Sequence, residues 1–373
     1  MTSSADVGFW RNRRVFVTGY TGFKGTWLCA MLLRRGAHVG GIALAPHTAP
    51  SLWERTPYAP HVDGRLLDVR DAAAVTSAVA SFRPQTILHL AAQPLVRRGY
   101  AEPVLTYSTN VMGTLHVLDA ARTIAELEHI VVVTSDKVYA DRPSPGGYRE
   151  DARLGGSEPY AGSKAAAELV AETYRQAYFS ASGCARVVSA RAGNVIGGGD
   201  FSADRLIPDA YRAIAERRVL ALRRPGAVRP WQHVLESLSG YVMLAEATAS
   251  GNARSDAYNF GPADGTVEVG TVAERFVRGF GLDPRTAIAI ESATEHETAV
   301  LEVDSTRARS ELGWMPRWTT GVAVDRSAAW YRGFLEGEPA AALIDRDIDA
   351  YDRMPAPYVS LDGIAGRETG DRG

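Results

Sequence analysis

The strongest constraint on the fold is an alternation of short apolar runs and longer helical runs that starts near residue 13. RRVFVTG (13–19), TILHLAA (86–92) and IVVVTS (130–135) are apolar almost throughout and not only at alternate positions. Strands of this kind are buried on both faces, and here they alternate with helical runs such as 25–36 and 104–122. The pattern therefore predicts a parallel sheet covered by helices on both sides. The same series continues with predicted strands at 38–44 and 185–197 and predicted helices at 72–82 and 163–179.

The rhythm changes after about residue 197, where prolines at 208, 225, 230 and 262 separate shorter elements. We therefore predict an α/β protein with a Rossmann-type, doubly wound parallel sheet over residues 1–190. A smaller mixed substrate domain, interwoven with the first, is predicted over residues 191–362. The polar segment 363–373 is predicted to be a disordered tail.

Composition excludes several classes of function. The chain has 373 residues, is 46% hydrophobic and carries a net charge of −2, so nothing draws it to nucleic acid or to an acidic membrane surface. No apolar run approaches the ~20 residues of a membrane span, and the amino terminus lacks the pattern of a signal peptide. Cys29 and Cys184 have no CxxC or Cys/His spacing, so no metal site is expected. We predict a cytoplasmic protein without nucleic-acid or membrane partners.

A glycine-rich loop follows the first predicted strand directly. TGYTGFKG (18–25) places Gly19, Gly22 and Gly25 where a helix begins. Glycine at these places permits a tight turn and close approach of a pyrophosphate, which the helix amino terminus then attracts. The second strand ends at Ala43 where an acidic residue often holds the adenosine ribose. NAD is the predicted cofactor; NADP stays open, because Lys24 could reach a 2′-phosphate.

The strand at 130–135 runs into Ser135, Asp136 and Lys137, and the next helical run carries Tyr160 and Lys164. Tyr160 and Lys164 are four residues apart, so they share one face of a helix. A lysine ammonium beside a phenol favours the phenolate and predicts a lowered pKa for Tyr160. The strand end thus supplies a hydroxyl, an acid and a base close to a tyrosine base.

These features, together with LLDVRD (66–71), HLAAQ (89–93) and YSTNVMGT (107–114), make the chain resemble the extended short-chain dehydrogenases/reductases. The resemblance covers nearly the whole sequence. It implies that Asp68 contacts adenine, that HLAAQ gives backbone contacts to the cofactor, and that Asn110 is an active-site asparagine. The cofactor-binding residues expected from it are Gly19, Thr21, Gly22, Phe23, Gly25, Asp68, Val69, Ala91, Ala92, Asn110, Tyr160 and Lys164.

Within that family the nucleotide-sugar 4,6-dehydratases carry an acidic pair after the hydroxyl residue, and a lysine in the second place resembles the CDP-glucose 4,6-dehydratases. RAGNVIGGGD (191–200), DRLIPD (204–209) and RPWQHVLE (229–236) resemble them as well. The resemblance implies conversion of CDP-glucose to CDP-4-keto-6-deoxyglucose in deoxysugar biosynthesis; the alternative is a dehydratase or epimerase for another nucleotide-sugar. The implied substrate-binding residues are Gln93, Asn194, Arg205, Leu206, Ile207, Arg229 and His233.

The chemistry predicted for these residues begins with oxidation at C4, which acidifies the hydrogen at C5. Tyr160 takes the 4-hydroxyl proton, Lys164 sustains the phenolate and Ser135 orients the hydroxyl. Asp136, kept protonated by burial, then donates to the departing 6-hydroxyl. Lys137 is the predicted base for the C5 proton, which requires its pKa to fall well below about 10.4; a water or Asp136 is the alternative base.

The helical runs 104–122 and 163–179 are long and carry apolar residues at helical spacing. They predict a homodimer joined by a four-helix bundle. A catalytically silent dinucleotide-binding regulator is the rival class of protein. That class predicts losses among the glycines, Tyr160 or Lys164, and all of these are present.

Overall fold

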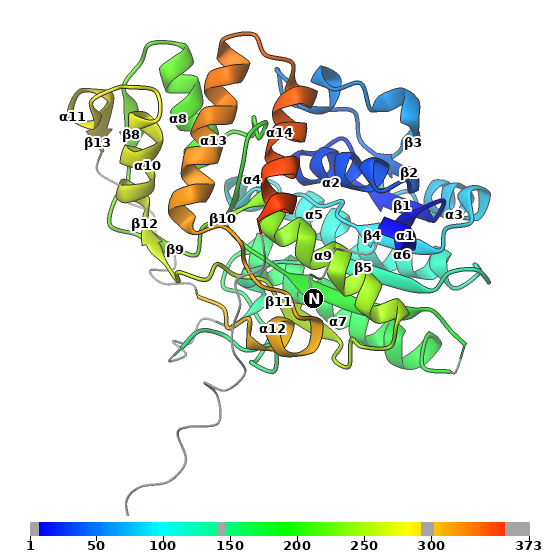
Figure 1. Ribbon diagram of the computed structural model, residues 1–373. Coiled ribbons are helices and arrows are strands. Elements are labelled where there is room, and N and C mark those ends of the chain that lie inside the picture. Colours follow the sequence, from blue (N-terminus) through cyan, green and yellow to red (C-terminus); the bar gives the residue numbers. More distant parts are fainter. Residues whose placement is uncertain (1–6, 141–145, 182, 292–301, 355–373) are drawn as a thin grey trace, which may run out of the picture.

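A seven-stranded sheet lies at the centre of the protein, and all of its strands are parallel (Figure 1). The computed structural model describes residues 7–140, 146–181, 183–291 and 302–354. In sheet order the strands are β11 (Ala257–Asn259), β6 (Arg186–Arg191), β5 (His129–Val133), β4 (Thr86–His89), β1 (Arg14–Thr18), β2 (His38–Ala43) and β3 (Val62–Leu66). The chain winds outward from β1 in both directions, which confirms the predicted Rossmann-type fold and places a ligand crevice beyond β1 and β4.

Helices cover both faces of this sheet, as strands that are apolar on both sides require. One face packs against α3 (Ala72–Phe82), α6 (Gly113–Ala121) and α7 (Pro159–Tyr178), where Phe16 of β1 joins the core. The other face packs against α2 (Phe23–Arg34) and α9 (Val234–Ala249), where Val15 and Val17 point. Alternate side chains of β1 therefore join two separate hydrophobic cores.

The helix predicted over 104–122 is interrupted. It consists of α5 (Pro103–Tyr107), a π-helical turn over Ser108–Met112, and α6. π-Helical turns insert one residue into a helix and recur at functional sites. Here the turn carries the buried Asn110.

The carboxyl-terminal half adds helices and three two-stranded sheets, β10–β7, β12–β9 and β13–β8. Its helices are α8 (Leu206–Ala215), α10 (Val269–Arg278), α11 (Pro284–Ala287), α12 (Thr306–Leu312), α13 (Thr320–Leu335) and α14 (Ala340–Arg353). Its short strands are β7 (Val195–Ile196), β8 (Leu220–Leu222), β9 (Val228–Arg229), β10 (Gln232–His233), β12 (Val267–Glu268) and β13 (Ile288–Ile290). The remaining short elements are α1 (Val7–Trp10), α4 (Val96–Ala101), two 3₁₀ turns at Trp53–Arg55 and Ala59–His61, and a third at Asp136–Val138.

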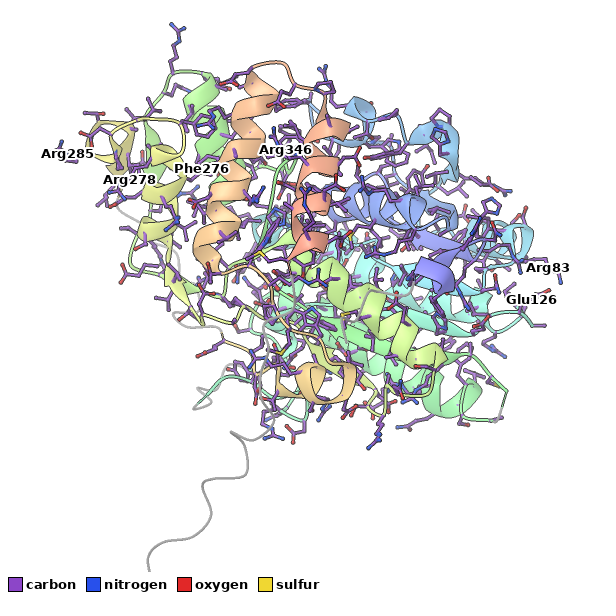
Figure 2. The ribbon with its side chains drawn as sticks, in the orientation of Figure 1. Arg83, Glu126, Phe276, Arg278, Arg285 and Arg346 are labelled. Carbon is purple, nitrogen blue, oxygen red and sulfur yellow. The ribbon has the colours of Figure 1, made fainter. Side chains whose placement is uncertain are left out.

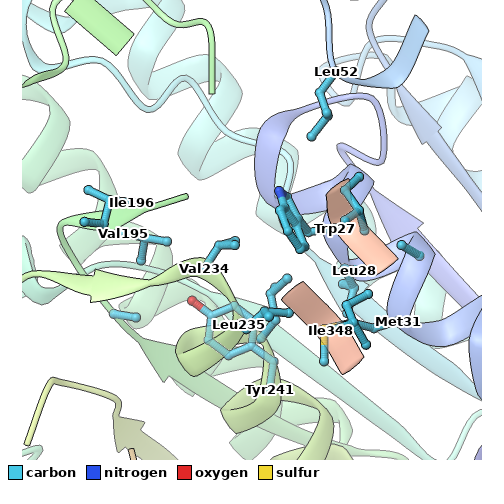
Figure 3. Packing of buried hydrophobic residues seen from close by; sticks show 14 of the residues in the cluster. Trp27, Leu28, Met31, Leu52, Val195, Ile196, Val234, Leu235, Tyr241 and Ile348 are labelled. Carbon is cyan, nitrogen blue, oxygen red and sulfur yellow. The ribbon is translucent and has the colours of Figure 1, made fainter. Parts of the chain in front are cut away.

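This half is woven into the first rather than added after it. β11 completes the central sheet beside β6, and α9 covers the β5 face. Figure 3 shows the resulting core, in which Trp27 of α2 lies near Ile348 of α14 and Tyr241 of α9. The domain boundary at residue 190 stays a prediction, and the predicted tail at 363–373 lies outside the described residues.

The two edges of the sheet differ. At the amino ends of the strands, side chains form ion pairs, such as Arg83 with Glu126 at the rim of the molecule (Figure 2) and Arg13 with Glu128 at 2.8 Å. At the carboxyl ends the chain forms a cleft lined by residues from both halves. Among the described residues no helix is long and apolar enough to cross a membrane.

Candidate active site

A cleft of about 1730 Å³ lies beyond the carboxyl ends of the parallel strands. With two exceptions, Asn110 and His233, every residue predicted for the site lines it. Segments far apart in the sequence thus meet where the topology predicts a ligand crevice.

The glycine loop is built for close backbone packing. Gly19 has a φ of +77°, which favours glycine, and its N–H donates to the carbonyl of Ile42 at 2.7 Å. A Cβ on Gly25 would lie 2.1 Å from the carbonyl oxygen of Gly19. The loop ends at the first turn of α2, where unpaired amides and the helix dipole favour an anion. This arrangement fits the pyrophosphate of a dinucleotide.

Residues that follow β3 line the same cleft as this loop. Asp68 and Val69 both line the cleft there. Arg70, which no sequence signal marked as a site residue, pairs its guanidinium with the carboxylate of Asp68 at 2.5 Å. This pairing lowers the pKa of Asp68 and keeps it ionised. Ala43 at the end of β2 brings no charge to the same region.

Lys24 does not point toward the adenosine end, so its proposed contact with a 2′-phosphate is not supported. Its Nζ donates to the hydroxyl of Tyr241 on α9 at 3.2 Å. Burial, with the nearby charges of Arg205 and Lys164, lowers the pKa of Lys24 to about 7. Lys24 therefore belongs to the catalytic side of the cleft, which only the position of α9 reveals.

Tyr160 and Lys164 lie one turn apart in α7, as predicted. The side chain of Glu158 caps this helix by accepting from the amide of Tyr160 at 2.7 Å. Lys164 is 6% exposed, and its Nζ donates to the carbonyl of Val133 at 3.0 Å. Burial lowers the pKa of Lys164 to about 8.

The predicted lowering of the Tyr160 pKa is wrong for this structure. Burial raises the pKa of Tyr160 to about 12, and the negative charge of Asp136 adds to the effect. A hydrogen bond with Ser135 and the positive charge of Arg205 act in the opposite direction. Desolvation of a phenolate outweighs these two favourable contacts.

Asp136 is 1% exposed at the end of β5. Its Oδ1 accepts from the hydroxyl of Ser135 at 3.0 Å, and its Oδ2 lies 3.4 Å from the amide nitrogen of Asn194. Burial raises the pKa of Asp136 although the positive charge of Lys137 opposes this. A raised pKa is what a proton-donating carboxyl requires.

Gly193, which was not among the predicted site residues, makes room for this carboxyl. A Cβ at Gly193 would lie 1.7 Å from Oδ2 of Asp136. Its neighbour Asn194 has a φ of +45°, and in this strained conformation its side chain faces Asp136. The motif RAGNVIG therefore shapes the acid's position, in addition to any contact with a phosphate.

Lys137 is half-buried and lines the cleft beside Asp136. Its backbone N–H donates to Oγ of Ser135 at 3.2 Å, which caps the 3₁₀ turn Asp136–Val138. The serine thus fixes the backbone that presents both ionisable side chains.

Asn110 supports the cleft from behind. Its Oδ1 accepts from the amide of Gln93 at 2.8 Å, and its Nδ2 donates to Oγ of Ser163 at 2.8 Å. The side chain of Gln93 in turn bonds to Leu95 and Thr106. Asn110 therefore positions the chain after β4 and does not face the cleft, in contrast to the prediction that it binds cofactor.

His233 is the second predicted site residue that does not line the cleft. It is fully buried, its Nδ1 accepts from the amide of Leu235 at 3.3 Å, and its ring packs against Trp27 and Trp318. Burial lowers its pKa to about 3, so it is neutral. His233 caps α9 in the core and does not line the substrate cleft.

The predicted nucleotide side comes from the carboxyl-terminal half. Leu206 and Ile207 open α8, preceded by Arg205, whose guanidinium lies 3.5 Å from Asp200. Arg229 of β9 is 7% exposed and contributes positive charge near Asp136. No cluster of three or more His, Cys, Asp or Glu that could hold a metal occurs within the described ranges.

A parallel sheet, a glycine loop and a buried Tyr–Lys pair at one sheet edge are features of the extended short-chain dehydrogenases/reductases. The chain belongs to the GDP-mannose 4,6 dehydratase family, whose model matches residues 16–326. It is 40% identical over 352 residues to the CDP-glucose 4,6-dehydratase of Salmonella typhimurium, covering 93% of this chain and 98% of that protein.

Solved structures share the fold. The dTDP-glucose 4,6-dehydratase DesIV of Streptomyces venezuelae, with NAD and TYD bound, is 24% identical with a TM-score of 0.74, over 88% of this chain and 99% of that one. The UDP-glucose 4-epimerase of Thermus thermophilus, in complex with NAD, is also 24% identical with a TM-score of 0.74, over 86% and 99%.

Proposed function

We propose that the protein converts CDP-glucose to CDP-4-keto-6-deoxyglucose and water, a step that supplies deoxysugar biosynthesis. The observation that carries this proposal is the buried acid Asp136 hydrogen-bonded to Ser135 beside Tyr160. An epimerase needs the hydroxyl and the tyrosine but no acid at this place. The name of the Salmonella relative supports CDP-glucose as the substrate.

The cofactor is NAD. Three features would hold this cofactor: the glycine loop, whose space a Cβ on Gly25 would fill, the amino terminus of α2, and the carboxylate of Asp68. The two solved structures above contain NAD. Held by these three features, NAD would supply the hydride acceptor for C4 and the hydride donor for C6.

The remaining steps belong to side chains of the chain itself. Tyr160 takes the 4-hydroxyl proton as a phenolate, a state that burial disfavours and that the hydrogen bond with Ser135, the charge of Arg205 and the neighbouring Lys164, held against the end of β5, must support. Asp136 donates a proton to the departing 6-hydroxyl. Lys137 takes the C5 proton and returns it to C5 after the 6-hydroxyl has left.

Substrate binding is assigned to the carboxyl-terminal side of the cleft. Arg205 and Arg229 supply positive charge for the diphosphate. Leu206 and Ile207 form an apolar wall for the base. Asn194 and Gln93 line the space between these residues and the catalytic group.

The test is a panel of CDP-, dTDP-, UDP- and GDP-linked glucose or mannose, incubated with purified protein and NAD and scored for alkali-labile 4-keto product. CDP-glucose is expected to give the highest kcat/KM. Release of water with another nucleotide as the better substrate would reassign the specificity, and a 4-epimer without loss of water would overturn the dehydratase proposal.

The protein is further proposed to act as a homodimer in the cytoplasm. Val104 and Leu169, on α5 and α7, are 81% and 53% exposed, which leaves apolar side chains on the helices predicted to pair; Tyr100, on the preceding α4, is 61% exposed. Sedimentation of the wild type as a dimer, and of Val104→Glu as a monomer, is the expected result. A wild type that remains monomeric at micromolar concentration contradicts the assembly.

A further inference from the structure

An ion pair that is almost removed from water lies next to the carboxyl end of β5. Arg191, the last residue of β6, donates from Nε to Oε1 of Glu168 at 2.9 Å and from Nη2 to Oε2 at 3.0 Å. The two side chains are 5% and 4% exposed, and neither residue lines the cleft. A buried ion pair often adds no more stability than apolar residues of similar size would. Stability alone therefore does not explain the place of this pair.

The pair is bound to the same strand end as Lys164. The hydroxyl of Thr134, directly after β5, donates to Oε1 of Glu168 at 2.5 Å. Nζ of Lys164 donates to the carbonyl of Val133, the last residue of β5, at 3.0 Å. Glu168 and Lys164 are four residues apart in α7, so they lie on one face of the helix, one turn apart. Successive turns of α7 therefore bind successive residues of the strand, and they bring a carboxylate beside the ammonium.

The charges of these two groups depend on opposite balances. Burial alone would raise the pKa of Glu168, but the charge and hydrogen bonds of Arg191, with the hydrogen bond from Thr134, outweigh burial and lower it. Glu168 is therefore ionised. Burial lowers the pKa of Lys164 to about 8, and the negative charge of Glu168 limits this fall. The charge of Lys164 thus depends on a carboxylate that lies outside the cleft.

Ionisable groups on the neighbouring elements do not replace Glu168 in this respect. Burial, followed by nearby positive charges that include Lys164, lowers the pKa of Lys24 at the start of α2 to about 7. On β4, burial and the charge of Lys164 lower the pKa of His89 to about 3, so this ring is neutral. At the end of β5, burial raises the pKa of Asp136, which favours its neutral form. These groups repel the ammonium or offer it little charge.

We propose that Glu168, paired with Arg191, is a positioning residue that keeps the ammonium of Lys164 charged and in place, so that Lys164 can support the phenolate of Tyr160. The assignment rests on the proposed dehydratase activity, in which Tyr160 accepts the proton of the 4-hydroxyl. Burial raises the pKa of Tyr160 to about 12, so its phenolate needs a cation nearby. A neutral amine at Lys164 would not supply one.

The composition of the chain makes this link directly measurable. Lysine occurs at three positions, 24, 137 and 164, and all three line the cleft. Lysine labelled with ¹³C at Cε therefore gives three NMR signals in the whole protein, which Lys24→Met and Lys137→Ala assign. In Glu168→Gln the pKa of Lys164 should fall by about one pH unit, because an opposite charge next to the ammonium has been removed. With CDP-glucose and NAD, the alkaline limb of the kcat/KM profile should move to lower pH by the same amount.

Matched variants separate an effect of charge from an effect of packing. Glu168→Gln keeps the shape of the side chain and removes its charge, whereas Glu168→Asp keeps the charge and shortens the side chain. The proposal predicts the larger fall in the pKa of Lys164 for Glu168→Gln; a role in packing alone predicts the larger effect for Glu168→Asp. Glu311→Gln removes a carboxylate that is bonded to Ser255 and Tyr258, and it should leave the titration of Lys164 unchanged.

Glu168→Gln leaves Arg191 buried without its counter-ion, which is strongly destabilising. If that variant does not fold, Glu168→Gln/Arg191→Met takes its place, and a fall in the pKa of Lys164 is expected there too. An unchanged titration of Lys164 in a folded variant without the carboxylate would overturn the proposal. So would a shifted titration that leaves the kcat/KM profile where it was. Absence of 4-keto product from the wild type would instead overturn the proposed function, and the NMR titration would still decide whether Glu168 acts on Lys164.

Discussion

The two sides of the cleft bind by different physical means. The cofactor side uses backbone and shape: Gly19 and Gly25 admit close packing, and the ion pair of Asp68 with Arg70 is partly exposed. The catalytic side uses ionisable side chains that are almost removed from water, such as Asp136 at 1% and Lys164 at 6% exposure. Shape can be encoded in a short motif, whereas a charge state depends on everything that buries the group.

This comparison predicts that chemistry and cofactor binding can be separated by mutation. Tyr160→Phe keeps the ring and removes the hydroxyl that accepts the O4 proton. Turnover is expected to fall by about 10²–10⁴-fold, while the dissociation constant for NAD, measured by calorimetry, stays within a few fold. Near-normal formation of 4-keto product by this variant would show that Tyr160 is not the base.

Lys137→Ala tests the second base on the catalytic side. Hydride transfer from C4 should survive, so reduced cofactor and the 4-ketoglucose nucleotide accumulate while elimination slows by about 10²–10⁴-fold. Exchange of the C5 hydrogen in heavy water, followed by NMR, should slow in parallel. Lys137→Glu should restore part of the elimination because a carboxylate can accept the same proton. Unchanged exchange in Lys137→Ala would assign the base to a water or to Asp136.

A methyl group added to the glycine loop should weaken the binding of NAD. Gly25→Ala places a Cβ 2.1 Å from the carbonyl oxygen of Gly19, so the loop must move. NAD affinity should fall about tenfold or more, equivalent to about 1.4 kcal/mol. Gly226→Ala is the matched control, because a Cβ there meets nothing within 4 Å. Equal NAD binding by both variants would contradict a cradle formed by the loop.

Burial should also raise the pKa of carboxyl groups that lie away from the cleft and take no part in the reaction. Glu236 of α9 accepts from the amides of Arg317 and Trp318, and burial raises its pKa from 4.5 to about 7. The folded protein binds this proton more tightly than the unfolded chain does. Its contribution to stability is therefore complete below pH 4.5 and is lost as pH rises through 7.

Glu236→Gln should remove the loss of stability that Glu236 causes as pH rises. Urea unfolding at pH 5.5 and pH 8 is expected to show a decline in stability that is smaller than in the wild type by about 2 kcal/mol. Asp347, whose pKa burial also raises to about 7, remains in both proteins, so the difference isolates Glu236. Identical declines in the two proteins would mean that Glu236 stays charged in the fold.

The smallest effect is expected at the exposed charge pair of the cofactor side. Arg70→Ala removes a partner of Asp68 whose side chain is 44% exposed. NAD affinity should change by less than about fivefold, and the change should shrink as salt is added. A larger, salt-independent loss would mean that this side too depends on a precise charge, and would weaken the contrast between the two sides.

The sheet, the glycine loop and the shared helical face of Tyr160 and Lys164 could all be predicted from the sequence. Each of these depends on spacing within about 20 residues or on the alternation of apolar runs, which is local information. The resemblance of short motifs also determined the family. Ser135, Asp136 and Lys137 were recognisable as a group because they are adjacent in the chain.

The remaining features of the site depend on contacts between segments that are far apart in the chain. Gly193 lies 57 positions after Asp136, and Tyr241 lies 217 positions after Lys24, yet these pairs set the place of the acid and the direction of the lysine. Asn110 and His233 have the residue types of binding groups, but packing turns them away from the cleft. Burial likewise decided the protonation of Tyr160 and Asp136, because desolvation is summed over neighbours that no local pattern contains.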